Sequence, residues 1–397
     1  MKKHRISDIL FVFCILAVLF GVLGLTLTRQ REEVSHYENR RLAVFPEFSQ
    51  EALLSGEFFA GIDEFLGDHS AFRTTLFRAK GWADIYLLRR PVVNDIIILD
   101  GLLLHYFPRE VAPSPQWLQQ EAQARARELA DLQAIINEYG GHFLYVAVPD
   151  QTAYFMDYFP HFLNNRQGYR PQLEAFRAAL YAYEVPFLDM GERFSAQGNP
   201  FDFYSGVDHH FSMYGAFYTY LAIIDTLIEQ TGLDIPRLDW EDFIFEVLPN
   251  PYVGSRGRLL WGMAPFTEHI TIARPRVEVP FYHWRNHGAR DASVFEFPNY
   301  DWQEIFFGVY MGGDHALTNI WTNRPELPSI LFFGDSFTNA VETVLYLNFN
   351  TMTGIDLRHF DEMSLAEFIK EHQPPIVVCL RDYSVLLYGG GNGRLFS

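Results

Sequence analysis

The sequence predicts an α/β fold in which helices cover both faces of a parallel sheet. Short apolar runs typical of buried strands alternate with helical segments, and 397 residues are enough to bury a sizeable core. A long helix is expected over 114–139, with a buried strand at 143–148. A second helix near 171–183 leads to a short strand at 185–188. All of these strands and helices precede the candidate catalytic residues in the chain.

Three divisions of the chain are expected. Residues 1–28 form a membrane segment, 29–90 a connector that packs on the domain, and 91–397 the main α/β domain. Residues 232–325 interrupt the strand and helix rhythm with many Pro, Trp, Tyr and Arg residues, which indicates an insertion, either poor in strands or rich in them, without a core of its own. An apolar strand over 96–99, followed by a turn, predicts the start of a hairpin.

The N-terminal segment is typical of a membrane anchor. Lys2, Lys3 and Arg5 precede an uncharged stretch at 9–28 that is about long enough to span a bilayer. No Ala-x-Ala-like site follows it, so we expect an uncleaved signal anchor, with cleavage as the alternative. Basic residues on the two sides nearly balance, so charge alone only weakly favours a single-pass cell-membrane protein with an extracytoplasmic domain.

Composition excludes some functions. The net charge of −18, from 31 basic and 49 acidic residues, argues against a nucleic-acid partner because phosphates would find no large basic surface. The two cysteines, Cys14 and Cys379, lie in apolar segments, so no disulfide is expected. Nothing in the motifs requires a cofactor, and no metal site is predicted.

A candidate nucleophile follows the apolar run at 330–333. There the chain reads Gly-Asp-Ser-Phe at 334–337, which places Ser336 just past a strand end, where open α/β sheets bind ligands. Glycine allows a sharp turn, and the Ser336 N–H could then face a developing oxyanion. The Gly-x-Ser-x-Gly elbow of α/β-hydrolases is absent, because position 338 is Thr. Ordinary turn chemistry is the alternative interpretation.

A candidate base lies about 125 residues upstream, in the sequence Asp208-His209-His210. If this loop is extended, alternate side chains share a side, so Asp208 could orient His210 as the general base while His209 points away and has a structural role. Ser212 is positioned to cap the following helix. Polar groups satisfied at a helix start are the alternative for Asp-His-His alone. Together with Ser336, the motif favours a Ser-His-Asp nucleophile.

The chain resembles the DHHW family, which is similar to the SGNH-like domains of the AlgX and AlgJ alginate O-acetyltransferases. The resemblance rests on motifs spread over nearly the whole extracytoplasmic part: 38–42, 45–46, 55–58, 68–69, 208–210, 312–315, 334–337 and 356–358. It implies an SGNH-hydrolase-like, flavodoxin-like three-layer fold whose Asp-x-His element precedes Gly-Asp-Ser, a circularly permuted order. It also implies Ser336 as nucleophile, His210 as base and Asp208 as its partner.

Two departures from the family pattern affect the substrate site. Phe211 stands where the family name has Trp, which keeps an aromatic wall but removes an N–H donor. The strand at 376–380 is followed by Arg381 and Asp382 and not by the Gly-x-Asn-Asp of ordinary SGNH enzymes. Arg381 either supplies the missing oxyanion interaction or pairs with Asp382, and Arg358 is an equal candidate for substrate binding.

Two further features lie in the insertion. Gly-Gly-Asp-His at 312–315 predicts a tight turn, and the role of His315 in metal or ligand binding is left open. Aromatic clusters such as 281–284 could stack on sugars, but in so Phe-rich a chain they more often belong to the core.

Three classes of function compete. We expect an O-acetyltransferase acting on a cell-envelope or exported polysaccharide, with carbohydrate acetylesterase as the alternative because the acyl-enzyme step is shared. The resemblance implies a membrane-bound O-acyltransferase partner that supplies acetyl groups. A metal phosphoesterase is disfavoured because no early Asp-x-Asp is present. An inactive carbohydrate-binding scaffold would leave the three triad residue types unexplained.

Overall fold

The computed structural model describes residues 2–107, 113–163, 169–197, 200–288, 290–291, 293–388 and 394–396. The chain divides into two compact units. The first contains residues 1–96 and 257–265, and the second contains residues 97–256 and 266–397.

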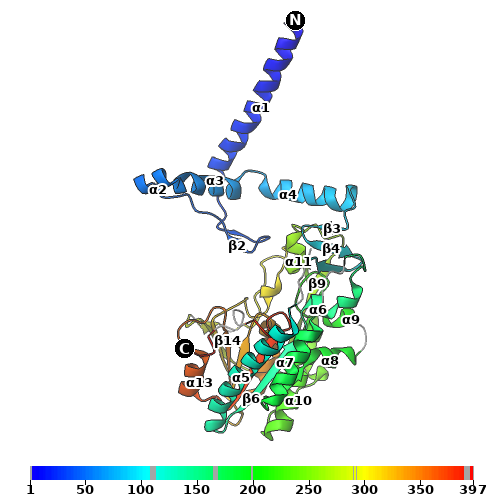
Figure 1. Ribbon diagram of the computed structural model, residues 1–397, viewed down its shortest axis with the longest axis vertical. Helices are drawn as coiled ribbons and strands as arrows, with labels where there is room; N and C mark the ends of the chain where they lie inside the picture. The colour runs from blue at the N-terminus through cyan, green and yellow to red at the C-terminus, as the bar shows by residue number, and fades with distance from the viewer. Residues whose placement is uncertain are drawn as a thin grey trace. The chain divides into compact units, whose positions relative to one another are not determined.

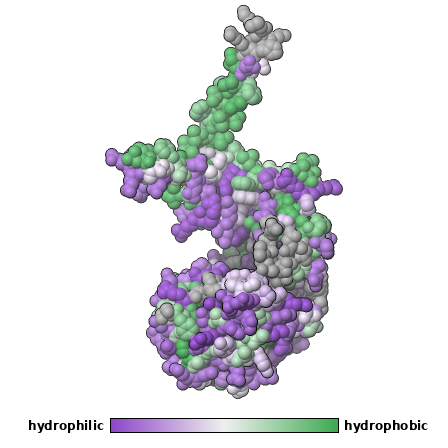
Figure 2. Space-filling model, in the orientation of Figure 1, coloured by the Kyte–Doolittle hydropathy of each residue, from purple (hydrophilic) through white to green (hydrophobic). Residues whose placement is uncertain are grey.

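The first unit begins with a long apolar helix, α1 (Lys2–Thr28). Within it, residues 7–28 have a mean hydropathy of 2.9 and are long and apolar enough to cross a membrane, a test that a signal sequence also passes. Figure 2 shows the apolar surface that this helix presents along its length. The expected membrane segment is therefore a continuous helix with almost no buried side chains.

The rest of the first unit consists of short elements joined by ion pairs. Arg40 binds Asp68 through both carboxylate oxygens, and Arg73 binds Glu38 at 2.8 and 2.9 Å. The Arg40 guanidinium lowers the pKa of Asp68 to about 2. The elements are β1 (Val34–Ser35), β2 (Arg40–Arg41), α2 (Gln50–Ser55), α3 (Glu57–His69), α4 (Arg73–Trp82), η1 (Ala83–Leu87) and β3 (Val92–Val93).

The second unit is built on an eight-stranded sheet with the order β11-β10-β12-β14-β13-β15-β6-β7. The five strands from β14 to β7 are parallel and almost wholly buried, as expected for strands with helices on both faces. They are β6 (His142–Val148), β7 (Phe187–Asp189), β13 (Ile330–Gly334), β14 (Thr351–Asp356) and β15 (Ile376–Asp382).

Helices form a layer on each face of this sheet (Figure 1), which confirms the predicted α/β class with three layers. On one face α5 (Pro115–Glu138), α7 (Arg170–Ala182) and α13 (Leu365–His372) share a core with alternate residues of the central strands. On the other face α10 (Met213–Thr231) and α12 (Phe337–Leu345) pack together and against β6, β13 and β15. The long helix predicted at 114–139 corresponds to α5, which Ser114 caps.

The insertion adds antiparallel strands to the parallel sheet. Its strands β10 (Tyr282–Arg285), β11 (Arg290–Asp291) and β12 (Leu317–Trp321) extend the sheet in antiparallel fashion beyond β14. A separate antiparallel pair is formed by β8 (Phe243–Tyr252) and β9 (Glu268–Pro275). The segment is thus rich in strands, one of the two alternatives that its composition left open.

Several short elements complete the described fold. At the predicted hairpin, β4 (Ile96–Leu99) and β5 (Leu102–His105) are adjacent strands joined by a two-residue turn. The others are α6 (Gln151–Tyr154), η2 (Met156–Tyr158), α8 (Met190–Ser195), α9 (Pro200–Phe203), η3 (Trp240–Asp242), α11 (Gly254–Leu259), η4 (Phe307–Val309) and η5 (Tyr346–Asn348).

Candidate active site

Ser336 lies where β13 ends and α12 begins. β13 is buried at every residue, whereas Ser336 is partly exposed, so the strand delivers the hydroxyl to the carboxyl edge of the sheet. Gly334 lets the strands approach closely, since a Cβ there would lie 2.1 Å from the carbonyl oxygen of Leu380 on β15. The parallel ladder thus fixes the backbone just before the candidate nucleophile.

The loop at 205–211 presents the candidate base. Its Ser205 hydroxyl accepts hydrogen bonds from the backbone N–H groups of Val207 and Asp208, at 3.1 and 3.0 Å, which turns the chain sharply. Ser212 ends the loop by capping α10, as the sequence predicted, with its hydroxyl accepting from Gly215 N–H. The two histidines are therefore held between a tight turn and a helix start.

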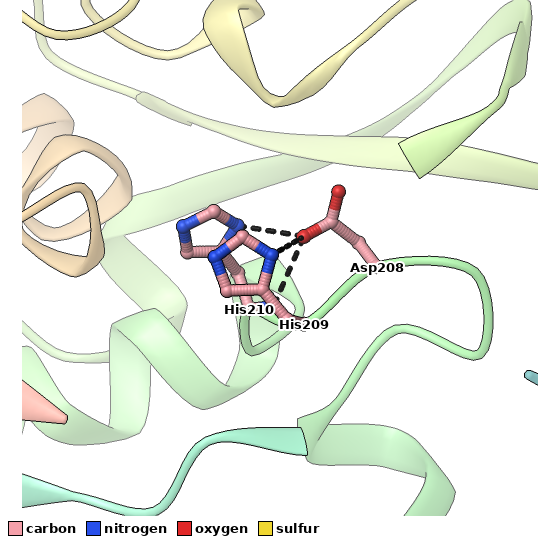
Figure 3. A group of neighbouring side chains, drawn as sticks. All are labelled: Asp208, His209 and His210. Atoms are coloured by element: carbon pink, nitrogen blue, oxygen red, sulfur yellow. Dashed lines mark hydrogen bonds and ion pairs between the residues drawn. The ribbon is translucent and has the colours of Figure 1, made fainter. Parts of the chain in front are cut away.

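Asp208, His210 and Ser336 form a continuous hydrogen-bonded line. Asp208 Oδ1 lies 2.7 Å from His210 Nδ1, and His210 Nε2 lies 2.8 Å from Ser336 Oγ. Figure 3 shows the carboxylate of Asp208 directed at the two imidazoles. Because Asp208 and His210 are buried while Ser336 is partly exposed, only the serine end of the line is open to a substrate. The three side chains therefore have the mutual geometry expected of a candidate nucleophile, base and orienting group.

Asp208 is held as a carboxylate. Burial opposes its ionisation, but interactions with His210 and His209 outweigh that cost and keep the pKa of Asp208 well below its usual value. The second oxygen, Oδ2, accepts the backbone N–H of Ser255 at 2.6 Å. A buried, ionised Asp208 can hold His210 in the tautomer that leaves Nε2 free to accept the serine proton.

A second carboxylate, that of Glu268, holds the backbone of the loop at 205–211. Glu268, the first residue of β9, accepts the backbone N–H groups of Gly206 and Val207 through Oε2, at 2.8 and 3.2 Å. Burial raises the pKa of Glu268 to about 7, and the charge of Asp208 acts in the same direction. Glu268 therefore fixes the backbone immediately before Asp208.

The expectation that His209 points away from His210 is wrong. The two rings lie side by side, with centroids 3.8 Å apart (Figure 3), and His209 Nδ1 lies 2.7 Å from Ser255 Oγ. The alternation of side chains holds only for an extended chain, and residues 206–210 form a bend. The bond to Ser255 is consistent with a structural role for His209.

Aromatic rings set the position of the base. The Phe307 ring stacks on the His210 imidazole at 3.7 Å and 6°, and Phe337 lies 4.8 Å away. Phe211, a candidate substrate contact, is only 1% exposed and packs edge-on against Phe337. It supports the serine helix from within the core and has no surface with which to meet a substrate.

Arg381 is buried beside the serine turn. Its side chain is 1% exposed, and Nη1 lies 3.7 Å from Asp335 Oδ2. Among the described residues, its guanidinium nitrogens have no hydrogen-bond acceptor. The structure therefore pairs Arg381 with Asp335 and not with Asp382. The pKa of Asp382 rises to about 8 through burial and the charges of Asp335 and Asp150.

Arg358 and His315 lie on the other side of Ser336. Arg358 binds Asp356 and, at 2.9 Å, Asp314, whose other oxygen accepts the side-chain amide of Asn339 on α12. Arg358 thus lies at the carboxyl edge of β14, next to the strand of Ser336, and is partly exposed. His315 Nδ1 lies 3.3 Å from the Asn286 amide, and burial lowers the pKa of its ring.

Among the described residues, two groups of side chains have spacings that could suit a metal ion: Asp208 with both adjacent histidines, and Asp314 with Asp356 and His359. The carboxylates of both groups already have protein partners. Asp314 and Asp356 pair with the Arg358 guanidinium, and Asp208 is bonded to His210 and to Ser255 N–H.

Sequence reasoning missed Ser255, Glu268 and Phe307. All three come from the insertion, 45 or more residues downstream of Asp208. Ser255 lies on α11, Glu268 begins β9 and Phe307 begins η4, and each of them contacts the loop that carries Asp208 and His210. A run such as Gly-Ser-Arg-Gly at 254–257 resembles an ordinary helix start. No local signal marks these residues as support for the site.

This fold and site define an α/β domain with a buried parallel sheet, at whose carboxyl edge Ser336, His210 and Asp208 lie in line. The family model for the SGNH hydrolase-like domain of the acetyltransferase AlgX matches residues 106–295, a segment that contains Asp208 and His210 and ends before Ser336. The search of curated protein sequences gave no significant match.

Solved structures share the fold. Bacillus cereus PatB1, in a structure with a sulfonyl adduct, is 20% identical, with a TM-score of 0.62 over 75% of this chain and 97% of its own. A DHHW family protein from Eubacterium siraeum is 18% identical, with a TM-score of 0.59 over 77% of this chain and 97% of its own. The chain is therefore similar to the AlgX-type SGNH-like and DHHW proteins, as its motifs indicated.

Proposed function

We propose that the protein is a membrane-anchored, extracytoplasmic O-acetyltransferase that modifies a cell-envelope or exported polysaccharide. The observation that carries the proposal is the line from Asp208 through His210 to Ser336, with both contacts within hydrogen-bond distance and only the serine accessible. The AlgX-type domain match supports an acyltransferase or esterase role. The partly exposed hydroxyl at a sheet edge supplies the nucleophile that such chemistry needs.

The mechanism has two half-reactions. Ser336 Oγ attacks the acetyl carbonyl of a donor ester while His210 Nε2 takes its proton, and the protonated imidazole then gives that proton to the departing donor oxygen. A carbohydrate hydroxyl next attacks the acetyl-serine ester and loses its proton to His210, which passes that proton to Ser336 Oγ as the serine leaves. The backbone N–H of Ser336 is the proposed oxyanion donor. Water in place of the sugar would make the same site an acetylesterase.

The N-terminal helix supports anchoring. A membrane-spanning α1 would hold the serine near a membrane-bound O-acyltransferase, the proposed source of acetyl groups, and so raise the effective donor concentration. Arg358 is the better placed of the two arginine candidates for substrate contact, since it is partly exposed while Arg381 is enclosed.

The proposal is tested with the full chain in detergent, an activated acetyl ester and intact-mass measurement. We expect an acetyl adduct or ester hydrolysis that is lost in Ser336→Ala and kept in the matched control Ser195→Ala, whose serine is exposed on α8. Equal turnover in Ser336→Ala would remove the serine mechanism. Adding oligosaccharides then separates transfer from hydrolysis, and an inactive scaffold would give neither.

A further inference from the structure

Part of the main sheet carries partly exposed side chains outside the site. They lie on one face of β10, β12 and the amino-terminal part of β14. We define the aromatic platform as the side chains on this face: Tyr282 and Trp284 of β10, Asn319 and Trp321 of β12, and Thr351 and Thr353 of β14. Each is at least partly exposed.

Strand alternation shows that the platform is a true sheet face. His283, Ile320 and Met352, whose side chains point to the opposite face, are all 0% exposed. By contrast, Tyr282 and Trp321 are each 38% exposed. The expectation that the aromatic cluster at 281–284 belongs to the core therefore holds for His283 and not for the residues on either side of it.

The rings lie together across neighbouring strands. Tyr282 pairs in register with Trp321, with ring centroids 5.6 Å apart and planes 31° apart, and Tyr282 lies 6.2 Å from Trp284. Beside them the Thr353 hydroxyl donates to Asn319 Oδ1 at 2.9 Å. Flat rings next to amide and hydroxyl groups match a pyranose, which offers an apolar C–H face and a hydroxyl rim.

We propose that the aromatic platform binds a neutral segment of a glycan chain. The platform contains no Asp, Glu, Lys, Arg or His side chain, and the net charge of −18 opposes a polyanion. Three partly exposed rings offer roughly 100 Å² each, far less than the ~800 Å² that a stable protein partner buries on one side. That area suits an oligosaccharide and not a folded protein or a second copy of this chain.

The platform lies within reach of Ser336. With strands ~4.8 Å apart and ~3.3 Å per residue, its residues lie roughly 17 Å (Thr353) to roughly 27 Å (Tyr282) from Ser336 along the sheet. Asn286 continues the line of β10 from Trp284, and its amide meets His315, the neighbour of the Arg358 partner Asp314. A chain of several sugars seated on the platform could therefore extend toward the proposed active site.

This inference rests on the proposed function only where it takes the bound glycan to be the acetyl acceptor. Glycan binding itself is measured without any acetyl transfer. The full chain in detergent is titrated with cellohexaose, mannohexaose and chitohexaose by calorimetry. We expect at least one to bind, and Trp321→Ala to weaken that binding about tenfold. The control Trp302→Ala removes a tryptophan that is 73% exposed but lies on a loop outside the platform, and it should bind as the unaltered protein does.

Several outcomes would overturn the proposal: no hexasaccharide binds, Trp321→Ala and Tyr282→Ala both bind normally, only a polyuronate binds, or the variants instead abolish self-association in sedimentation. Circular dichroism confirms that each variant is folded. If the unaltered protein binds a hexasaccharide but does not hydrolyse the acetyl ester, only the proposed function is contradicted. If it hydrolyses the ester but binds no hexasaccharide, only the proposed glycan site is contradicted.

Discussion

The two halves of the candidate site are positioned in different ways. Ser336 is placed by a parallel ladder, with Gly334 in register with Leu380 and Asp356 on its two neighbouring strands. His210 lies on a bend that depends on hydrogen bonds from distant residues, among them Ser255 and Glu268. The serine is therefore held by the core itself, whereas the base is held by a small number of polar contacts that can be removed one at a time.

The largest expected effect comes from breaking the link between the two halves. His210→Ala removes the base and should lower acetyl-ester turnover by about 10⁵-fold or more, close to Ser336→Ala, because the pair acts as a unit. The measurement is the initial rate of ester hydrolysis. His161→Ala alters an exposed histidine elsewhere and serves as the matched control. A loss of less than about tenfold would show that another group takes the serine proton.

Asp208→Asn sharpens the comparison within the histidine loop. Asparagine cannot hold His210 in the required tautomer, so turnover should fall about 10³- to 10⁴-fold with the fold retained. Asp225→Asn, which alters an exposed partner of Arg237, is the control. The same assay applies, and a variant with unchanged kcat would contradict the orienting role of Asp208.

Gly334→Ala tests the serine half through stability. A Cβ would lie 2.1 Å from the Leu380 carbonyl oxygen and 2.8 Å from the Thr338 side chain, so β13 and β15 must separate. We expect a loss of about 3 kcal/mol in the free energy of unfolding. Gly308→Ala, whose Cβ would meet no atom closer than 3.7 Å, should change stability little. Denaturant unfolding measures both, and equal midpoints would contradict the close approach of the strands.

Glu268→Gln tests the support behind the histidine loop through pH. The pKa of Glu268 is about 7 in the folded protein against 4.5 for an unperturbed carboxyl. The unfolded chain therefore loses this proton first, and Glu268 destabilises the fold progressively as pH rises from about 4.5 to 7. Glu268→Gln removes that dependence, so its stability relative to the unaltered protein should rise across this window, by about 2 kcal/mol.

The comparison is made by unfolding the two proteins at pH 4.5, 6 and 8. Glu342 and Asp382 also have raised pKa values, to about 7 and about 8, but they remain in both proteins and cancel in the difference. A difference that stays flat with pH would show that folding does not shift the pKa of Glu268.

The smallest effect is expected for Ser255→Ala. The backbone N–H of Ser255 donates to Asp208, and the substitution keeps that hydrogen bond. It removes both contacts of the Ser255 hydroxyl with His209, one at the backbone N–H and one at ring Nδ1. Turnover should fall less than about tenfold, with a stability loss of about 1 kcal/mol. The ester assay and thermal unfolding measure the two quantities. A loss as large as that of Asp208→Asn would give His209 a direct part in the chemistry.

The sequence by itself determined the parts of this protein that depend on local patterns. The apolar runs predict β6, β13 and β15, the Ala and Glu enrichment predicts α5, and the serine after Gly334 follows from a strand that ends in a turn. Asp208 and His210 are only two positions apart, so their contact could also be predicted. These features depend on neighbours in the chain, whose preferences a pattern records.

Only the tertiary structure decided how the distant parts meet. It brought Ser336 to His210, turned Arg381 inward to Asp335, set the two histidine rings side by side, and placed Glu268 and Phe307 against the loop. It also left the side chains of the aromatic platform partly exposed, where composition had favoured core positions. Such contacts join residues far apart in the chain, and which of them form is set by packing and burial over the whole domain.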